Sequence, residues 1–292
     1  MFVQENTWNG IQAYFKSELG NKFSSRELKL ILKTLYCKRF LITETDYLLI
    51  KDERLSESDL LYFHGSLKRM RSNEPFQYVV GETEFYGLNL KCDPRALIPR
   101  PETEELVDWI VSSNHEKKVF VDLCSGSGCI ALGLKSALPQ SKIYAVEYSS
   151  GAVELIKDNI KETELEINVI EADVLKNFFY DTIEAKVDII VSNPPYIPLK
   201  DKVQMESNVL DFEPEMALFV ENDDPLIFYR EIIKNGKRIL SSNGWIYFEI
   251  HEDLAADVIE LFEKEDFVNI ELRKDLQGKD RMVRGQVVNW GL

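Results

Sequence analysis

The sequence predicts an α/β fold built on a mostly parallel, seven-stranded sheet, with a small helical domain before it. Three observations point to this fold. After residue 118, short apolar runs alternate with helix-length segments, as in a parallel sheet covered by helices on both faces. Residues 7–73 instead carry apolar side chains at helical spacing. The last two strand-like runs are joined only by a short polar stretch, which indicates an antiparallel hairpin at the sheet edge.

The first predicted domain comprises residues 1–73 and is helical. Ser24, Thr43 and Ser56 each stand three positions before an acidic residue, which is the pattern of a capping box at the start of a helix. An acid in the first helical turn also suits the positive end of the helix dipole. Because the helical pattern stops near Asn73, we place a domain boundary there.

Residues 74–99 are expected to form a β-hairpin linker. Short aromatic and β-branched runs in this segment are interrupted by Gly81, Gly87 and Pro94. Residues 100–292 then form the predicted sheet domain. Its strand candidates, in chain order, are Val119–Leu123, Ile143–Glu147, Ile167–Glu171, Val187–Ser192, Trp245–Ile250, Val268–Arg273 and Arg281–Val288.

Composition narrows the classes of function. The 292 residues include 35 basic and 50 acidic side chains, and the net charge of −15 disfavours binding to nucleic-acid phosphates. The four cysteines form no Cys-x-x-Cys pair and have no histidine at metal-ligand spacing, so we expect no metal site. No apolar run approaches the ~18 residues of a membrane span. These observations predict a cytoplasmic protein without membrane attachment, and no surface pattern requires more than a monomer.

A glycine-containing turn follows the first predicted strand and leads into a helix predicted over Cys129–Leu138. The turn is Cys124-Ser125-Gly126-Ser127-Gly128, and its glycines let a ligand approach the backbone closely. Glu147 ends the next strand, where an acid can accept both hydroxyls of a ribose. Asp173 and Val174 follow the third strand, where Asp173 could accept from an exocyclic adenine amine. These residues predict a nucleoside-containing cofactor but do not by themselves exclude a dinucleotide.

The fourth predicted strand runs directly into Asn193-Pro194-Pro195-Tyr196. An amide or arylamine nitrogen is a poor nucleophile because its lone pair is delocalised. Two acceptors, the Asn193 side-chain oxygen and the Pro194 carbonyl, would favour a pyramidal nitrogen and stabilise its developing positive charge. The consecutive prolines stiffen the turn and remove two N–H donors, and Tyr196 can stack on a planar group. The loop therefore predicts methyl transfer from a sulfonium to a planar NH2 group, without a metal or a strong base.

Further motifs accompany the turn and the proline loop. They are Gln77-Tyr78-Val79 with Gly81, Phe85-Tyr86-Gly87, Leu97–Glu104, Ser192–Ile197, Glu213-Pro214 with Ala217-Leu218, and Asp280-Arg281. With these motifs the sequence resembles, over nearly its whole length, the bacterial protein-(glutamine-N5) methyltransferases that modify peptide chain release factors. The resemblance implies a Rossmann-like S-adenosylmethionine-dependent methyltransferase fold, with S-adenosyl-L-methionine as methyl donor and S-adenosyl-L-homocysteine as its product.

The resemblance also implies roles for particular residues. Cys124–Gly128, Glu147, Val174 and Asn193 would contact the cofactor, whereas Asp173 rests on the strand-end argument alone. Asn193, Pro194, Pro195 and Tyr196 would hold the target glutamine, with Asn193, Pro194 and Tyr196 acting in catalysis. The implied substrate is the Gly-Gly-Gln glutamine of a class-I release factor, whose methylation modulates translation termination. We hypothesise that the helical domain docks this protein partner, since it is separate from every cofactor motif.

The sequence departs from the family pattern in two places. Cys124-Ser125 stands where Gly-Thr is usual, so a positive φ at Cys124 would be strained, and Glu147 stands where Asp is commoner. A third segment, Ile98–Glu105, has two interpretations. Pro101 suits the first turn of a helix running to Val111, which favours a structural role over substrate contact.

Three alternatives remain open at this stage. The same loop serves an adenine-N6 methyltransferase of nucleic acid, although the acidic balance argues against stable nucleic-acid binding. It also serves a glutamine methyltransferase of a ribosomal protein, although the motifs before residue 120 favour the release-factor branch. A non-enzyme alternative is a catalytically silent cofactor-binding scaffold, which the intact turn and loop argue against.

Overall fold

The computed structural model describes residues 5–50, 52–114, 116, 118–176, 180, 182–183, 185–205 and 207–288. The chain divides into two compact units. One consists of residues 1–81 with 206–212, and the other of residues 82–205 with 213–292. Each unit has an apolar core of its own. No helix among the described residues is long and apolar enough to cross a membrane.

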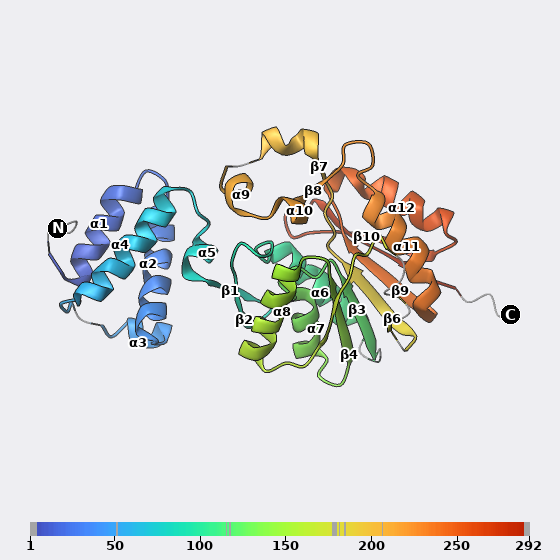
Figure 1. Ribbon diagram of the computed structural model, residues 1–292, viewed down its shortest axis with the longest axis horizontal. Helices are drawn as coiled ribbons and strands as arrows, with labels where there is room; N and C mark the ends of the chain where they lie inside the picture. The colour runs from blue at the N-terminus through green and yellow to red at the C-terminus, as the bar shows by residue number, and fades with distance from the viewer. Residues whose placement is uncertain are drawn as a thin grey trace. The chain divides into compact units, whose positions relative to one another are not determined.

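The first unit is helical; Figure 1 draws its helices α1 to α5 in blue to cyan and α9 in yellow to orange. The three predicted capping boxes at Ser24, Thr43 and Ser56 are confirmed, because each side chain bonds the N3 backbone and the N3 acid bonds back. Phe15 and Phe63 are completely buried in its core. The helices are α1 (Trp8–Leu19), α2 (Ser25–Phe40), α3 (Glu44–Tyr47), α4 (Glu57–Arg71), α5 (Phe76–Val80) and α9 (Ser207–Phe212).

The segment over which the sequence suggests a hairpin begins with a helix. Helix α5 spans only five residues and ends at Gly81, whose φ is +82°. Such a short helix shows no periodicity in the sequence, which is why a pattern search passes over it. The hairpin of β1 (Glu82–Phe85) and β2 (Leu88–Lys91) follows. Tyr86 and Gly87 both have positive φ, as the tight two-residue turn of a hairpin requires.

The second unit contains the predicted seven-stranded sheet, and the α/β fold is confirmed. The strand order is β10-β11-β9-β6-β3-β4-β5. The pairs from β9 to β5 are parallel, and β11 runs antiparallel to both of its neighbours. The strands are β3 (Val119–Leu123), β4 (Lys142–Glu147), β5 (Asn168–Glu171), β6 (Val187–Ser192), β9 (Leu240–Glu249), β10 (Val268–Lys274) and β11 (Asp280–Gln286).

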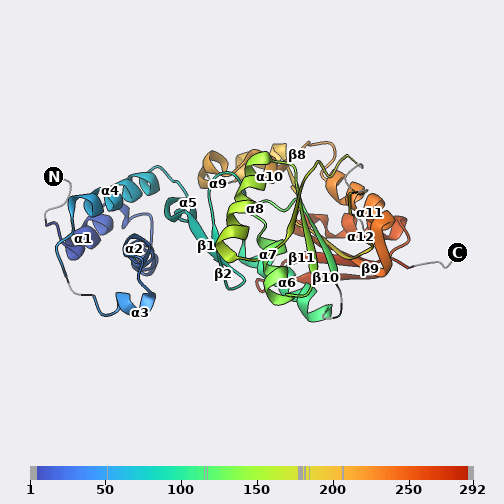
Figure 2. The same ribbon diagram turned by 60° about the horizontal axis from the view of Figure 1, so that its bottom comes forward.

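Helices cover both faces of the sheet, as Figures 1 and 2 show. Phe120 of β3 packs with helices α6, α7 and α8, whereas Val121 and Leu123 of the same strand pack with α11 and α12. This alternation explains why the central strands are apolar throughout. The helices are α6 (Pro101–Ser113), α7 (Cys129–Ala137), α8 (Ser150–Thr163), α10 (Glu215–Leu218), α11 (Ile227–Ile239) and α12 (Ala255–Lys264).

Short elements complete this unit. Beyond β6 lie the two-residue strands β7 (Ile197–Pro198) and β8 (Phe219–Val220), which pair in parallel. The 3-10 helices are η2 (Leu199–Gln204) and η3 (Glu252–Leu254). Most predicted strand boundaries agree to within two residues, and the largest difference is at β9, which begins at Leu240 rather than Trp245, because Leu240 pairs with Val187 before an irregular stretch interrupts the register.

The topology places several strand ends side by side. Strand β3 has β4 on one side and β6 on the other, so the chain reverses its order of strands between β3 and β6. Ligands of open α/β sheets bind outside the carboxyl ends of the strands at such a switch point. The turn after Leu123, the acid Glu147 and the loop after Ser192 all lie at this edge.

Candidate active site

The glycine turn between β3 and α7 has a left-handed backbone. φ is +59° at Cys124, +55° at Gly126 and +79° at Gly128, which is the N-cap of α7. A Cβ at Gly128 would lie 3.2 Å from both Cγ1 and Cγ2 of Ile156, so this position requires glycine for backbone and for space. A Cβ at Gly126 would meet only Ala96, at an ordinary 3.9 Å.

Cys124 therefore has the strained, positive-φ backbone that was expected if a residue with a Cβ replaced glycine here. A residue with a Cβ pays about 1–2 kcal/mol in the left-handed region. Part of this cost is offset, because the side chain packs against the apolar cluster beneath α11 and α12. Desolvation by these neighbours raises the pKa of the Cys124 thiol well above its ordinary value. Desolvation likewise raises the pKa of the nearby Cys129 to about 12.

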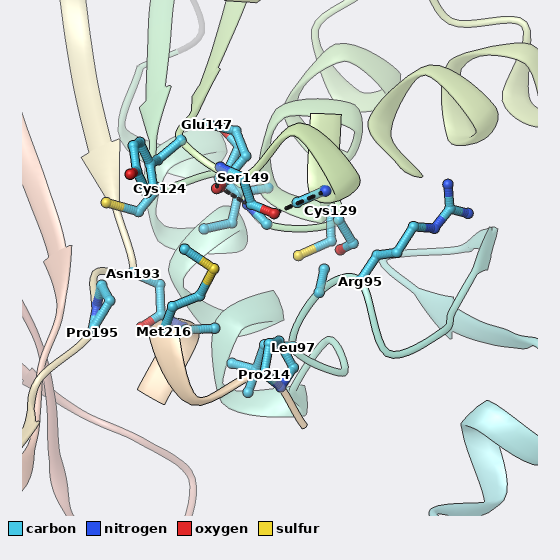
Figure 3. Close-up of a pocket in the computed structure, with 18 of the residues that line it drawn as sticks. Arg95, Leu97, Cys124, Cys129, Glu147, Ser149, Asn193, Pro195, Pro214 and Met216 are labelled. Carbon is cyan, nitrogen blue, oxygen red and sulfur yellow. Dashed lines mark hydrogen bonds between the residues drawn. The ribbon is translucent and has the colours of Figure 1, made fainter. Parts of the chain in front are cut away.

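Glu147 joins the turn to the loop that follows β4. Its Oε2 accepts from the Gly126 backbone N–H at 2.8 Å, and its Oε1 accepts from the Ser149 N–H at 2.8 Å. A carboxylate oxygen has two lone pairs, so each oxygen keeps one acceptor site. Figure 3 shows Glu147 and Ser149 beside Cys124. Glu147 is thus a fixed pair of acceptors at the cavity wall.

A cavity of about 370 Å³ opens over this edge of the sheet. In Figure 3, Cys124 and Glu147 lie towards the top of the view, with Asn193, Pro195 and Met216 below them. The structure brings most of the predicted residues to this one cavity. Those that line it are Cys124, Ser125, Gly126, Ser127, Glu147, Asp173, Val174, Asn193 and Pro195; Gly128, Pro194 and Tyr196 do not.

Asp173 and Val174 lie at the wall that β5 supplies. Asp173 Oδ1 accepts from the Leu175 N–H at 3.0 Å, and Oδ2 lies 3.4 Å from Lys176 Nζ. Asp173 is therefore already engaged locally, although its oxygens retain further acceptor sites. Val174 is buried and contributes apolar surface, as do Leu97 and Phe228.

The proline loop leaves β6 at a point that is tightly fixed. Ser192 Oγ donates to the Leu123 carbonyl at 2.6 Å and so ties the ends of β6 and β3 together. Pro194 and Pro195 are buried. The Tyr196 ring packs against the core, with its centroid 6.0 Å from that of His251. Burial raises the pKa of the Tyr196 hydroxyl, so this group stays protonated.

Glu213, which is distant in the chain, holds the segment before α6 in place. The Glu213 carboxylate accepts from the Ile98 N–H at 3.1 Å and forms an ion pair with Arg100. Its side chain is only 1% exposed. Arg100 is also the N-cap of α6, and Pro101 is its first residue. These contacts give Ile98–Glu105 a structural function at the cavity wall.

Asp122, one residue before the end of β3, is buried, and within the described part of the chain neither of its carboxylate oxygens makes a hydrogen bond of ordinary geometry, although Ser125 and the Ala131 backbone lie close enough to lower its pKa. Desolvation raises its pKa to about 8. Among the described residues, no group of three or more His, Cys, Asp or Glu is arranged to hold a metal ion.

Two residues near Asn193 are absent from the sequence-based site. Thr103 of α6 lines the cavity, and Glu249 ends β9, next to the end of β6. Thr103 Oγ1 donates to Glu249 Oε2 at 2.6 Å, and Asn193 Nδ2 lies 3.5 Å from Thr103 Oγ1. An acid as the last residue of a predicted strand is the signal that identifies Glu147, but it passes over Glu249 because the predicted strand runs on to Ile250, whereas β9 ends at Glu249.

Comparisons with known proteins agree on one class. The family model described as Methyltransferase small domain matches residues 102–211. A methyltransferase from Pyrococcus furiosus shares the fold, with a TM-score of 0.51, 14% identity, and coverage of 70% of this chain and 90% of that one. The matching family model therefore indicates the class of methyltransferases, and the shared fold agrees with it.

The curated relatives define the family. A release factor glutamine methyltransferase from Flavobacterium psychrophilum is 37% identical over 275 residues, covering 92% of this chain and 95% of that protein. The protein of the same name from Bacteroides thetaiotaomicron is 38% identical over 276 residues, covering 94% and 98%. The chain belongs to the release factor glutamine methyltransferase family.

Proposed function

We propose that this chain methylates the side-chain amide nitrogen (N5) of the glutamine in the Gly-Gly-Gln motif of class-I peptide chain release factors, acting in the cytoplasm. S-adenosylmethionine is the methyl donor. One observation carries the proposal: Glu147 and Asn193 line the same cavity, Glu147 at one side and Asn193 at the other. The substrate class follows from relatives that are themselves named for release factor glutamine methylation.

The residues around the cavity fit S-adenosylmethionine. The two oxygens of Glu147 each keep an acceptor site, which suits two neighbouring ribose hydroxyls. The bare backbone at Gly126 permits close approach of the ligand. Leu97, Val174 and Phe228 supply apolar surface that suits a flat, uncharged base. When bound, S-adenosylmethionine supplies an activated methyl group on a sulfonium.

The chain's own residues would prepare the glutamine amide. Asn193 Oδ1 and the Pro194 carbonyl would each accept one N–H of that amide, so that its nitrogen lone pair is directed at the donor. Holding the two reactants in line contributes several kcal/mol, by order of magnitude. The Tyr196 ring would pack against the planar amide. Pro195 of the same loop lines the cavity, and Pro194 and Tyr196 are its neighbours in the chain.

The rest of the chain would select the partner. The net charge of −15 suits a basic surface on the release factor and disfavours stable binding to nucleic acid. We assign docking of the factor to the helical residues 1–73 and methyl transfer to residues 100–292, with residues 74–99 as the connection. The chain would act as a monomer.

The test uses the purified chain, labelled S-adenosylmethionine and four acceptors. These are a release factor with Gly-Gly-Gln, its Gly-Gly-Ala variant, DNA, and total ribosomal protein. We expect label only on the Gly-Gly-Gln factor, and none with the Asn193→Ala enzyme. Label on DNA, on ribosomal protein or on the Gly-Gly-Ala factor would overturn the proposed substrate.

A further inference from the structure

We propose that Glu249 and Thr103 are positioning residues that fix which way round the side-chain amide of Asn193 lies. The inference deepens the proposed function and rests on it for the role of Asn193. Glu249 does not line the cavity, whereas Asn193 and Thr103 do. Glu249 therefore acts through its neighbours and does not touch the substrate itself.

The carboxyl group of Glu249 is buried. The residue is 3% exposed, although it carries a carboxyl group at the end of β9. Its backbone carbonyl accepts from the Tyr229 hydroxyl at 3.1 Å, which holds the strand end in place. A buried carboxyl group is costly unless hydrogen bonds repay its desolvation. Its partners are therefore informative about why it is there.

The single hydrogen of the Thr103 hydroxyl fixes the direction of the hydrogen bonds around it. The Thr103 hydroxyl has a single hydrogen, which it donates to Glu249 at 2.6 Å. Thr103 Oγ1 can then only accept from Asn193, whose Nδ2 lies 3.5 Å away. The Asn193 side chain also lowers the pKa of Glu249 by hydrogen bonding and so favours its carboxylate, which is likewise an acceptor. Both neighbours therefore require the NH2 end of Asn193.

These two acceptors determine where Oδ1 of Asn193 points. The amide oxygen and nitrogen of asparagine diverge, so turning Nδ2 towards Thr103 and Glu249 turns Oδ1 away from them. Oδ1 is the atom that must accept from the substrate amide. Were the amide reversed, Nδ2 would point at the substrate as a donor and oppose its N–H groups. In the reversed arrangement, Thr103 Oγ1 and the Glu249 carboxylate would both face an acceptor and lack a donor.

The charge of Glu249 depends on groups from every side. Arg281 of β11 lies close and favours the carboxylate, while Glu102 of α6 disfavours it. Tyr196, Tyr229 and Cys129 face the same carboxyl group as neutral groups. Desolvation is the largest influence and raises the pKa of Glu249 to about 7. The acceptor form is thus present above about pH 7 and is lost as the pH falls through that value.

The experiment compares Glu249→Gln, Thr103→Val and Thr103→Ser in the full chain. Glutamine keeps the size of Glu249 but replaces one acceptor by a donor, so Asn193 is favoured in its reversed orientation. We expect Glu249→Gln to lower kcat by about 100-fold and Thr103→Val by about tenfold, with S-adenosylhomocysteine affinity and melting temperature retained. Thr103→Ser keeps the hydroxyl and should restore the wild-type rate. Wild-type kcat in Glu249→Gln would overturn the inference.

A second readout needs no methyl acceptor. In protein labelled with ¹⁵N-asparagine, the side-chain resonance of Asn193 is assigned by its absence in Asn193→Asp. It should titrate with a midpoint near pH 7 in the wild type and stay flat in Glu249→Gln. An Asn193 resonance with the same pH dependence in both proteins would refute the positioning role. This measurement stands even where the proposed release-factor substrate fails, so the two failures are distinguishable.

Discussion

Glu147→Gln is the sharpest test of the cofactor assignment, because it keeps the size of the side chain and changes only its charge and hydrogen-bonding capacity. The wild-type carboxylate accepts one backbone N–H on each oxygen, from Gly126 and from Ser149, both at 2.8 Å. In glutamine one oxygen becomes an NH2 group, which faces a backbone N–H with another donor. One end of the side chain must therefore lose its backbone partner and its remaining acceptor site.

The magnitude follows from the bonds affected. A hydrogen bond to a charged group contributes about 1.5–3 kcal/mol, and about 1.4 kcal/mol corresponds to a tenfold change in affinity. The loss of one ribose acceptor thus predicts that S-adenosylhomocysteine binds Glu147→Gln about 10- to 100-fold more weakly. Glu147→Asp keeps both acceptors on a shorter arm and should lose less.

The assay is isothermal titration calorimetry with S-adenosylhomocysteine and its 2′-deoxy and 3′-deoxy analogues. If Glu147 binds the ribose, removing a hydroxyl should weaken binding to the wild type more than to Glu147→Gln, as a double-mutant cycle detects. Thermal denaturation of both proteins checks that the fold persists. Equal losses for the analogues in both proteins would refute the assignment of Glu147 to the ribose.

Three further predictions concern stability. Gly128→Ala should cost more than about 2 kcal/mol, since it adds contact with a neighbouring side chain to left-handed strain, while Gly126→Ala should cost only about 1–2 kcal/mol; equal midpoints in urea would contradict this. Arg100→Met should destabilise by about 3 kcal/mol because it leaves the Glu213 carboxylate buried without its cation, and Glu213→Gln should cost less in the same denaturation assay. The pKa of Asp122 is raised to about 8 in the folded state, so its contribution to stability is lost as the pH rises from the unfolded pKa of about 4 to about 8; Asp122→Asn should flatten the fall in melting temperature between about pH 5 and 8, and an unchanged slope would count against it.

Local signals in the sequence predicted much of the fold. The capping boxes at Ser24, Thr43 and Ser56 involve residues three positions apart, and their geometry is confirmed. Strands β3 and β6 have the predicted bounds because each is a buried apolar run that ends at a polar turn. The short helix α5 and the early start of β9 were missed, since one is below a helical period and the other is irregular.

The candidate site was predictable where it follows strand ends and not where it depends on distant pairing. Glu147 and Asn193 each end or follow a strand of the parallel sheet, so topology alone brings them to one edge. The bond between Thr103 and Glu249 joins residues 146 positions apart, from a helix and a strand. No spacing in the sequence signals such a pair. The position of Tyr196 likewise depends on how the loop packs.

The two thiols in the cavity have a consequence for the survival of the enzyme itself. Cys124 and Cys129 both line the space in which a reactive methyl donor would bind. A thiolate is a far better nucleophile than an amide and would capture the methyl group first. Desolvation makes the thiolate form of both residues scarcer still, because it raises each pKa above its ordinary value. The apolar packing around the turn would thereby slow the transfer of a methyl group to the protein's own cysteines.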